Sequence, residues 1–237
     1  MKWIASFVFA FTLLLPASAH SEAGFAVVHD GDGHSTIRQS PDVQSAIVGR
    51  VTAGCIVYVH DNRGNWLSVS YGQGDKAGYG FLHRSRVERV DDLKAIPLKS
   101  EAEHRIVFES ATIRIEIESE KFDAKKLPVT LIRFPGGGEC VTEINYEPIW
   151  GTDGILPGTR YKGISVTQNK KKLEIPAEAT AGLFEPRLSH PSTSAFSDEE
   201  TGTIFITAFN SDGAGAYGCA LRIVGGKFQD RAIFPGS

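Results

Sequence analysis

Hydrophobic and polar residues alternate along much of the chain, in short runs that predict β-strands rather than helices. The clearest run is 113–118 (IRIEIE), in which isoleucine occupies every second position and a charged residue follows each one. That period of two places the isoleucines on one face, as in a half-buried strand of an antiparallel sheet. Apolar runs at 128–134 and 203–209 predict two more strands, and the runs 218–224 and 227–234 flank a two-glycine turn suited to a hairpin. The second half of the chain is therefore predicted to be a β-sandwich.

Residues 24–91 contain five or six shorter strand-like segments, separated by turns rich in Gly, Asp and Asn. They include 25–29, 55–59 and 66–71, and they leave too little room for helices between them. Twenty-five glycines and eleven prolines, spread along the chain, also interrupt any long helix. The predicted fold class is all-β, with a small barrel followed by a second antiparallel, sandwich-like domain.

An ordered set of motifs runs through this first part of the chain. It consists of Thr36-Ile37-Arg38-Gln39-Ser40-Pro41, Val48-Gly49, Gly54, Asn65-Trp66-Leu67-Ser68-Val69 and Gly80-Phe81-Leu82-His83. The set resembles the bacterial SH3 (SH3b) family, whose pattern runs from an N-V-R-x-x-P-like segment through an I-G-x-x-x-x-G turn and G-x-W to a G-W-V-like strand. The resemblance covers under a third of the chain, and Phe81 stands where the family often has Trp.

The resemblance implies an SH3-like barrel that binds cell-wall peptides or protein segments, without indicating which residues touch the ligand. The candidate ligand-binding residues, which would form a shallow aromatic groove, are Trp66, Tyr71, Tyr79 and Phe81. In the alternative interpretation Trp66 is a structural wall of the barrel, because so small a barrel needs large aromatic side chains to fill it.

The first nineteen residues have the features of a secretory signal peptide. Lys2 is followed by an apolar run at 3–15, and Pro16 precedes the small-x-small motif Ala17-Ser18-Ala19. The run is shorter than the ~20 residues that a membrane-spanning helix needs, and a retained membrane anchor is the alternative. A lipid anchor would need a cysteine directly after the cleavage site, whereas the first cysteine is Cys55. We therefore expect a protein secreted across the inner membrane, periplasmic or extracellular, with no membrane span after cleavage.

The predicted organisation is a signal peptide (1–19), an SH3-like domain (24–91), a linker (92–104) and a β-rich domain (105–237). The linker is assigned because the segment is charged and contains Pro97. The last domain resembles no family that we recognise from its sequence.

The charge balance argues against nucleic acid as a partner. Removal of the signal peptide takes one of the 25 basic residues, Lys2, and leaves 24 against 28 acidic residues, a formal charge of −4. Binding to nucleic acid would need positive charge clustered on one face. The longest basic run, 170–172, lies between two strand-like segments and is interpreted as a solvated turn.

Three cysteines are an odd number for a protein of an oxidising compartment. The predicted disulfide joins Cys140 to Cys219, because both lie in the second half beside Gly-rich turns. It would close a loop of about 80 residues and stabilise the fold by roughly 4 kcal/mol, through the lost chain entropy of the unfolded state. Cys55 is then expected to be buried as a small hydrophobic residue. Three free thiols are the alternative, because a sequence does not fix the separation of Cα atoms.

Motifs for catalysis are missing from the sequence, and we predict no catalytic residue, no metal ligand and no cofactor. Neither Cys140 nor Cys219 is followed by a helix-like pattern, so neither thiol gains the helix N-terminus that activates a nucleophile. The segment 29–34 (HDGDGH) has side chains that could hold a metal weakly. It lacks the later acidic ligand of a calcium loop and is interpreted as a polar turn.

Three hypotheses for the function follow. The first is an exported, non-catalytic binding protein of the periplasm or cell envelope, which recognises peptidoglycan or a protein segment through its SH3-like domain. The second is an inhibitor or immunity protein that binds an exported toxin or cell-wall hydrolase, a task for which rigid β loops are suited. The third is an unrecognised peptidoglycan hydrolase, whose turnover would depend on Cys140 or Cys219. The sequence does not determine the oligomeric state.

Overall fold

The computed structural model describes residues 23–73 and 77–236. Within these ranges the chain forms β-strands and short 3₁₀ turns and no α-helix, so the predicted all-β fold class is confirmed. The predicted signal peptide lies outside the described residues. Across the described ranges, no helix has the length and apolar character needed to cross a membrane.

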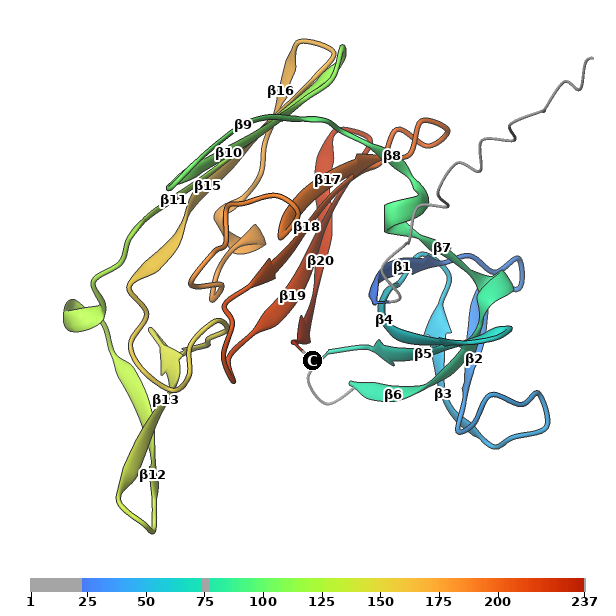
Figure 1. Cartoon of the computed structure of the whole chain (residues 1–237), viewed down its shortest axis with the longest axis horizontal. Helices are drawn as coiled ribbons and strands as arrows, with labels where there is room; N and C mark the ends of the chain where they lie inside the picture. Colours follow the sequence, from blue (N-terminus) through green and yellow to red (C-terminus); the bar gives the residue numbers. More distant parts are fainter. Residues whose placement is uncertain (1–22, 74–76, 237) are drawn as a thin grey trace, which may run out of the picture.

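The first domain is one antiparallel sheet of seven strands, in the order β3-β2-β6-β5-β4-β1-β7. Its strands are β1 (Gly24–Val28), β2 (His34–Arg38), β3 (Ile47–Thr52), β4 (Ile56–Arg63), β5 (Trp66–Tyr71), β6 (Gly78–His83) and β7 (Val87–Arg89). The sheet curls around its own core (Figure 1). Register shifts after Ile37 and Val59 contribute to this curvature, because β-bulges increase the local twist of a strand.

The core of the first domain is aliphatic and comes from alternate positions of the strands. Its buried members are Ala26, Val28, Ile37, Val51, Val57, Val59, Leu67, Val69 and Leu82. Leu67 and Leu82 lie opposite each other on β5 and β6, so their sequence neighbours Trp66, Phe81 and His83 lie on the opposite, outward face of this hairpin.

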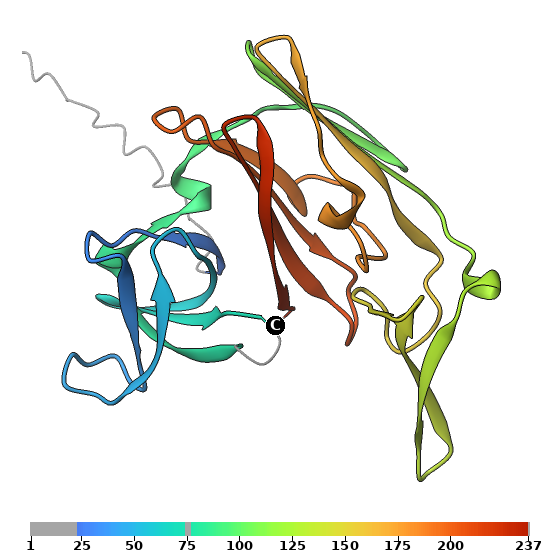
Figure 2. The same cartoon turned by 180° about the vertical axis from the view of Figure 1, so that it is seen from behind.

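The second domain contains two five-stranded antiparallel sheets and a separate three-stranded sheet (Figures 1 and 2). The first five-stranded sheet, in the order β16-β15-β11-β10-β9, consists of β9 (Leu98–Ala102), β10 (Arg105–Glu109), β11 (Ile113–Lys121), β15 (Thr159–Gln168) and β16 (Lys171–Leu173). The second, in the order β20-β19-β18-β17-β8, consists of β8 (Lys94–Ala95), β17 (Thr193–Ser197), β18 (Ile204–Asn210), β19 (Tyr217–Val224) and β20 (Lys227–Pro235). The three-stranded sheet consists of β12 (Val129–Phe134), β13 (Gly138–Ile144) and β14 (Glu147–Pro148).

The two five-stranded sheets share one hydrophobic core, which confirms the predicted sandwich. Ile115 and Ile117 on β11 are buried, as their alternation with charged residues predicts. They belong to the same apolar cluster as Ile206 and Leu221, which lie on β18 and β19 of the other sheet. The alternation at 113–118 therefore arises because one face of this strand is buried in the core of the sandwich.

The predicted two-glycine hairpin is also confirmed, since Gly225 and Gly226 connect β19 to β20. Both glycines have positive φ, of 57° and 78°. A two-residue turn of the mirror-image type I requires positive φ at both central positions, which glycine adopts without steric cost.

An aromatic cluster joins the two domains. Phe25 and Tyr58 of the first domain pack against Phe209 and Phe234 of the second. Phe25, Tyr58 and Phe234 belong to a buried apolar cluster drawn from both domains, and Phe209 lies at its exposed margin. The ring centroids of Phe25 and Phe209 are 5.5 Å apart, and those of Tyr58 and Phe234 are 6.0 Å apart. A Cβ at Gly218 would come within 3.1 Å of two of these rings, so the rings occupy the space beside that glycine.

The segment predicted as a linker, 92–104, contains two paired edge strands of the second domain instead. β8 pairs with β17, and β9 pairs with β10. Every residue of β9 is exposed, including Lys99 and Glu101. A solvent-exposed edge strand of this kind has no buried apolar face, so its sequence is as charged as that of a linker. Its backbone is nevertheless hydrogen-bonded to the neighbouring strand of the sheet.

The predicted disulfide between Cys140 and Cys219 is contradicted, because all three cysteines are free. Cys219 lies on β19 with its side chain in the sandwich core, whereas Cys140 lies on β13 in the three-stranded sheet and packs against Gly154. The two thiols therefore belong to different layers of the domain. The expected burial of Cys55 is also contradicted, because Cys55 is exposed at the turn that precedes β4.

Candidate ligand-binding site

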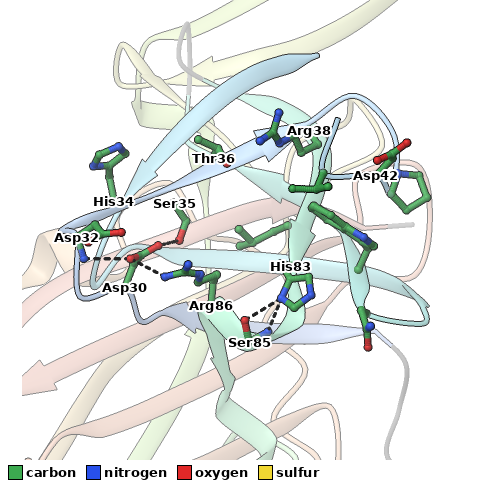
Figure 3. A pocket seen from close by; sticks show the side chains of 15 residues that line it. Asp30, Asp32, His34, Ser35, Thr36, Arg38, Asp42, His83, Ser85 and Arg86 are labelled. Atoms are coloured by element: carbon green, nitrogen blue, oxygen red, sulfur yellow. Dashed lines mark hydrogen bonds and ion pairs between the residues drawn. The ribbon is translucent and has the colours of Figure 1, made fainter. Parts of the chain in front are cut away.

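A groove opens in the first domain where β2 and β6 separate. Among the described residues only one pair, Arg38 opposite Phe81, joins these two strands. Beyond that pair, toward His34 on β2 and His83 on β6, the strands border a cavity of about 810 Å³ (Figure 3). We call this cavity the β2–β6 groove. Its position follows from the incomplete pairing, because a continuous ladder would have closed it.

Asp30 fixes one end of the β2–β6 groove. Its carboxylate accepts hydrogen bonds from Ser35 Oγ at 2.5 Å, from the Asp32 N–H at 3.0 Å and from Arg86 Nη1 at 2.9 Å. The bond from Ser35, and then that from Asp32, hold the pKa of the Asp30 carboxyl below its ordinary value. Asp30 is therefore ionised at neutral pH and ties β2 to the 3₁₀ turn Arg84–Arg86 that follows β6.

Arg38 fixes the opposite end of the groove. Its Nη1 donates to the carbonyl oxygen of Ser45 at 2.7 Å, and this bond holds the loop between β2 and β3 against β2. Asp42 and Val43 lie on that loop, are exposed, and form the rim of the groove. The guanidinium carries more N–H donors than this one bond uses, and Arg38 lines the groove.

Trp66 and His83 form an aromatic wall of the groove. They are cross-strand neighbours on β5 and β6, with ring centroids 5.3 Å apart and planes at 90°. His83 Nδ1 lies 2.7 Å from Ser85 Oγ, which orients the imidazole against the turn (Figure 3). Trp66 is only half-buried, so part of the indole is available to a ligand.

The groove carries ionisable groups of both signs. Arg38 and Arg86 supply guanidinium groups, while Asp32 and Asp42 supply exposed carboxylates at the rim. Across the described part of the chain, no group of three His, Cys, Asp or Glu side chains is placed to hold a metal ion. The arrangement suits a polar ligand that bears both positive and negative charge and has an apolar portion to lie on Trp66.

The four predicted aromatic residues divide between two faces of the β5–β6 hairpin. Trp66, Tyr79 and Phe81 share the outward face, where the rings of Tyr79 and Phe81 are 6.2 Å apart. Tyr71 lies on the other face, packs onto Gly49 and Gly78, and donates its hydroxyl to the Val48 carbonyl oxygen at 3.3 Å. Only Trp66 of the four lines the groove.

The sequence does not show that the polar residues of the groove lie together. The segment 29–34 has the pattern of a polar turn, and Arg86 lies 56 positions after Asp30. An aspartate in a turn and a distant arginine carry no local signal of their contact. The only local signal is the mixture of polar residues and glycines at 30–35, which spans a turn and the start of β2.

A second group of polar side chains lies inside the sandwich of the second domain. We call Tyr161, Asn210, Tyr217 and Cys219 the Tyr161 cluster. Asn210 Nδ2 donates to the Tyr161 hydroxyl oxygen at 2.9 Å, and the Tyr217 hydroxyl donates to the Phe184 carbonyl oxygen at 3.0 Å. Burial raises the pKa of the Cys219 thiol to about 12 and raises the pKa of the Tyr161 hydroxyl. The thiol is therefore protonated at neutral pH, which makes it a poor nucleophile.

No protein-family model, curated protein or solved structure matches this chain.

Proposed function

We propose that this chain is an exported, non-catalytic binding protein of the bacterial cell envelope, which holds a peptide segment of peptidoglycan in the β2–β6 groove. The observation that carries the proposal is the groove itself, with charged groups of both signs beside a half-buried tryptophan. The resemblance of residues 36–83 to the SH3b family and the signal-peptide features of 1–19 support the same proposal.

The chemistry of the groove favours a peptide over a sugar chain or a nucleic acid. A peptidoglycan stem peptide carries carboxylates and an amine on a short, partly apolar backbone. Arg38 and Arg86 match the carboxylates, because guanidinium groups bind carboxylates through parallel N–H···O bonds. Asp32 and Asp42 match the amine, and Trp66 offers a flat apolar surface for the side chains between them.

Binding without turnover is proposed because the thiol of Cys219 and the groove carboxylate of Asp30 are both badly placed for hydrolysis. The thiol of Cys219 is enclosed in the sandwich core, and burial keeps it protonated. The carboxylate of Asp30 is occupied by three hydrogen bonds, so it is a positioning group for the groove wall.

The test is sedimentation of the mature protein with insoluble murein sacculi, with a parallel assay for soluble fragments. We expect the protein to pellet with sacculi and to release no fragments. Trp66→Ala should weaken the binding about tenfold or more, since a buried aromatic anchor commonly contributes that much. The matched control is Tyr79→Ala, an exposed aromatic residue of the same domain outside the groove, which should bind like the unaltered protein.

Each other outcome has a definite meaning. Loss of binding in Tyr79→Ala but not in Trp66→Ala would move the site out of the groove, to the neighbouring rings of Tyr79 and Phe81. Release of fragments would overturn the non-catalytic proposal. Failure to pellet would refute peptidoglycan as the ligand and favour a soluble protein partner, such as a toxin or wall hydrolase that this chain would inhibit.

A further inference from the structure

The hairpin of β12 and β13 extends away from the body of the second domain. Figures 1 and 2 show it projecting from the end of the sandwich that lies farthest from the first domain. β12 is the outer strand of the three-stranded sheet, and its only strand partner among the described residues is β13. One edge of β12 therefore presents backbone N–H and C=O groups without a strand partner in the described chain.

The side chains of β12 are apolar and exposed on both faces of the hairpin. Leu131 is 43% exposed on one face, and Ile132 and Phe134 are 51% and 55% exposed on the other. The only charged side chain of the strand is Arg133, which pairs with Glu139 across the hairpin at 2.7 Å. The strand is thus rich in residues that favour β-structure and lacks an unpaired charge.

The other seven sheet edges found in residues 23–73 and 77–236 carry features that discourage strand pairing. β7, β8, β14 and β16 have only two or three residues each. β3 and β9 contain Arg50, Lys99 and Glu101, and β20 contains Lys227, Asp230 and Arg231. Short length and charged residues are the usual protection of an exposed edge, and a long apolar edge without them is a site of pairing with another chain. β12 also has a charged residue, Arg133, but it is the only one on the strand and is held by Glu139 within the hairpin, so the protection of this edge is weak.

We infer that β12 pairs with β12 of a second copy of this chain, antiparallel and about a two-fold axis. The pairing joins two three-stranded sheets into one sheet of six strands. A two-fold axis through Ile132 places this residue opposite its own copy, Thr130 opposite Phe134, and Leu131 opposite Arg133. Two isoleucines then meet on one face, each Leu131 lies beside the aliphatic stem of an Arg133 on the other, and no two like charges lie directly opposite each other.

A second copy suits this edge because the strand complements itself. Each Arg133 brings its own carboxylate partner, Glu139, so the paired hairpins add no unbalanced charge at the junction. Because the hairpin projects clear of the sandwich, two copies can approach at β12 without contact between their bodies (Figure 1). A junction of six residues per chain falls below the ~1,200 Å² of a stable interface, so we expect a weak, reversible dimer.

The experiment is sedimentation velocity of the mature chain from about 1 µM to about 1 mM, the range in which weak protein dimers form. The weight-average mass should rise from that of a monomer toward that of a dimer. Ile132→Lys should hold the protein monomeric over the whole range, because two lysines would meet at the axis. The matched control is Tyr146→Lys, which introduces the same charge at an exposed aromatic residue on the β13–β14 turn and should dimerise normally.

A charge-swap experiment tests the pairing itself. Ile132→Glu should also be monomeric, and an equimolar mixture of Ile132→Glu with Ile132→Lys should restore the dimer, because opposite charges then face each other across the axis. Both substitutions lie at an exposed position, and unchanged thermal unfolding of each monomer would show that its fold is intact. A monomer at every concentration, or a dimer that Ile132→Lys leaves unaffected, would overturn the inference. Neither result bears on the β2–β6 groove.

Discussion

The β2–β6 groove and the Tyr161 cluster both gather polar side chains, but only the groove is open to a ligand. In the groove, Asp32 and His34 remain exposed while Asp30 is held by its three donors. In the cluster, Asn210 is 1% exposed, and its amide donates a hydrogen bond to the Tyr161 hydroxyl inside the sandwich. The two groups differ in access, and the open group carries charged side chains whereas the enclosed group is made of Tyr, Asn and Cys.

Strand pairing accounts for this difference. β18 and β19 pair along the whole length of β18, so the polar side chains on their inner face are enclosed by the opposite sheet. β2 and β6 share a single residue pair, and the gap beside it admits solvent. An incomplete ladder therefore turns ordinary polar residues into a candidate binding site, whereas a complete ladder turns them into structural groups.

The largest expected effect comes from breaking the contact between the two domains. Phe25→Ala removes a buried ring that packs on Tyr58, Phe209 and Phe234. The free energy of unfolding should fall by about 3–5 kcal/mol, as for other buried Phe→Ala substitutions. Urea denaturation measures it, with the exposed Phe134→Ala as a control that should change by less than about 0.5 kcal/mol. A loss below about 1 kcal/mol in Phe25→Ala would contradict a shared core.

The next largest effect is expected in the enclosed Tyr161 cluster. Asn210→Ala removes the donor to the Tyr161 hydroxyl and the acceptor of the Arg187 N–H, which lies 2.8 Å from Asn210 Oδ1. The unfolding free energy should fall by about 3 kcal/mol, because buried polar groups lose their partners. Binding to sacculi should be unchanged. The control is Asn62→Ala, an exposed asparagine, and an equal loss in both variants would refute a special role for the Tyr161 cluster.

The smallest effect is a pH dependence in the first domain. His60 packs between Tyr58 and Tyr79, and burial lowers the pKa of its imidazole below the ordinary 6.5. The fold therefore favours the neutral imidazole. Its stabilisation is complete above pH 6.5 and is lost as the pH falls through the lowered pKa. Denaturation between pH 7 and pH 5 should show a smaller decline in His60→Gln than in the unaltered protein. An identical decline in both would contradict the assignment.

Much of the fold could be predicted because it depends on local patterns. The alternation of Ile113, Ile115 and Ile117 reports a buried face directly, and two adjacent glycines at 225–226 report a turn that few other residues can form. These signals are confined to a few neighbouring positions, so a single sequence carries them in full.

The candidate site depends on contacts between distant positions, and these could not be predicted. The bond between Asp30 and Arg86 spans 56 positions, and the separation of β2 from β6 is a property of the whole sheet. A disulfide between Cys140 and Cys219 is predicted because both lie beside Gly-rich turns in the second half of the chain. In the structure the two residues lie in different sheets and both thiols are free. Only Trp66 among the predicted aromatic residues lines the groove, because its position at the start of β5 places it beside the gap.

The central claim is that a peptide of the cell wall binds in the β2–β6 groove, and a titration followed by NMR tests it most directly. A soluble peptidoglycan fragment with an intact stem peptide is added to the ¹⁵N-labelled mature protein. We predict shifts of the Trp66 indole N–H and of the backbone N–H groups of Thr36 and Ser85, which line the groove, while the Tyr161 cluster is unaffected. An absence of shifts, or shifts confined to Tyr79 and Phe81, would contradict the account.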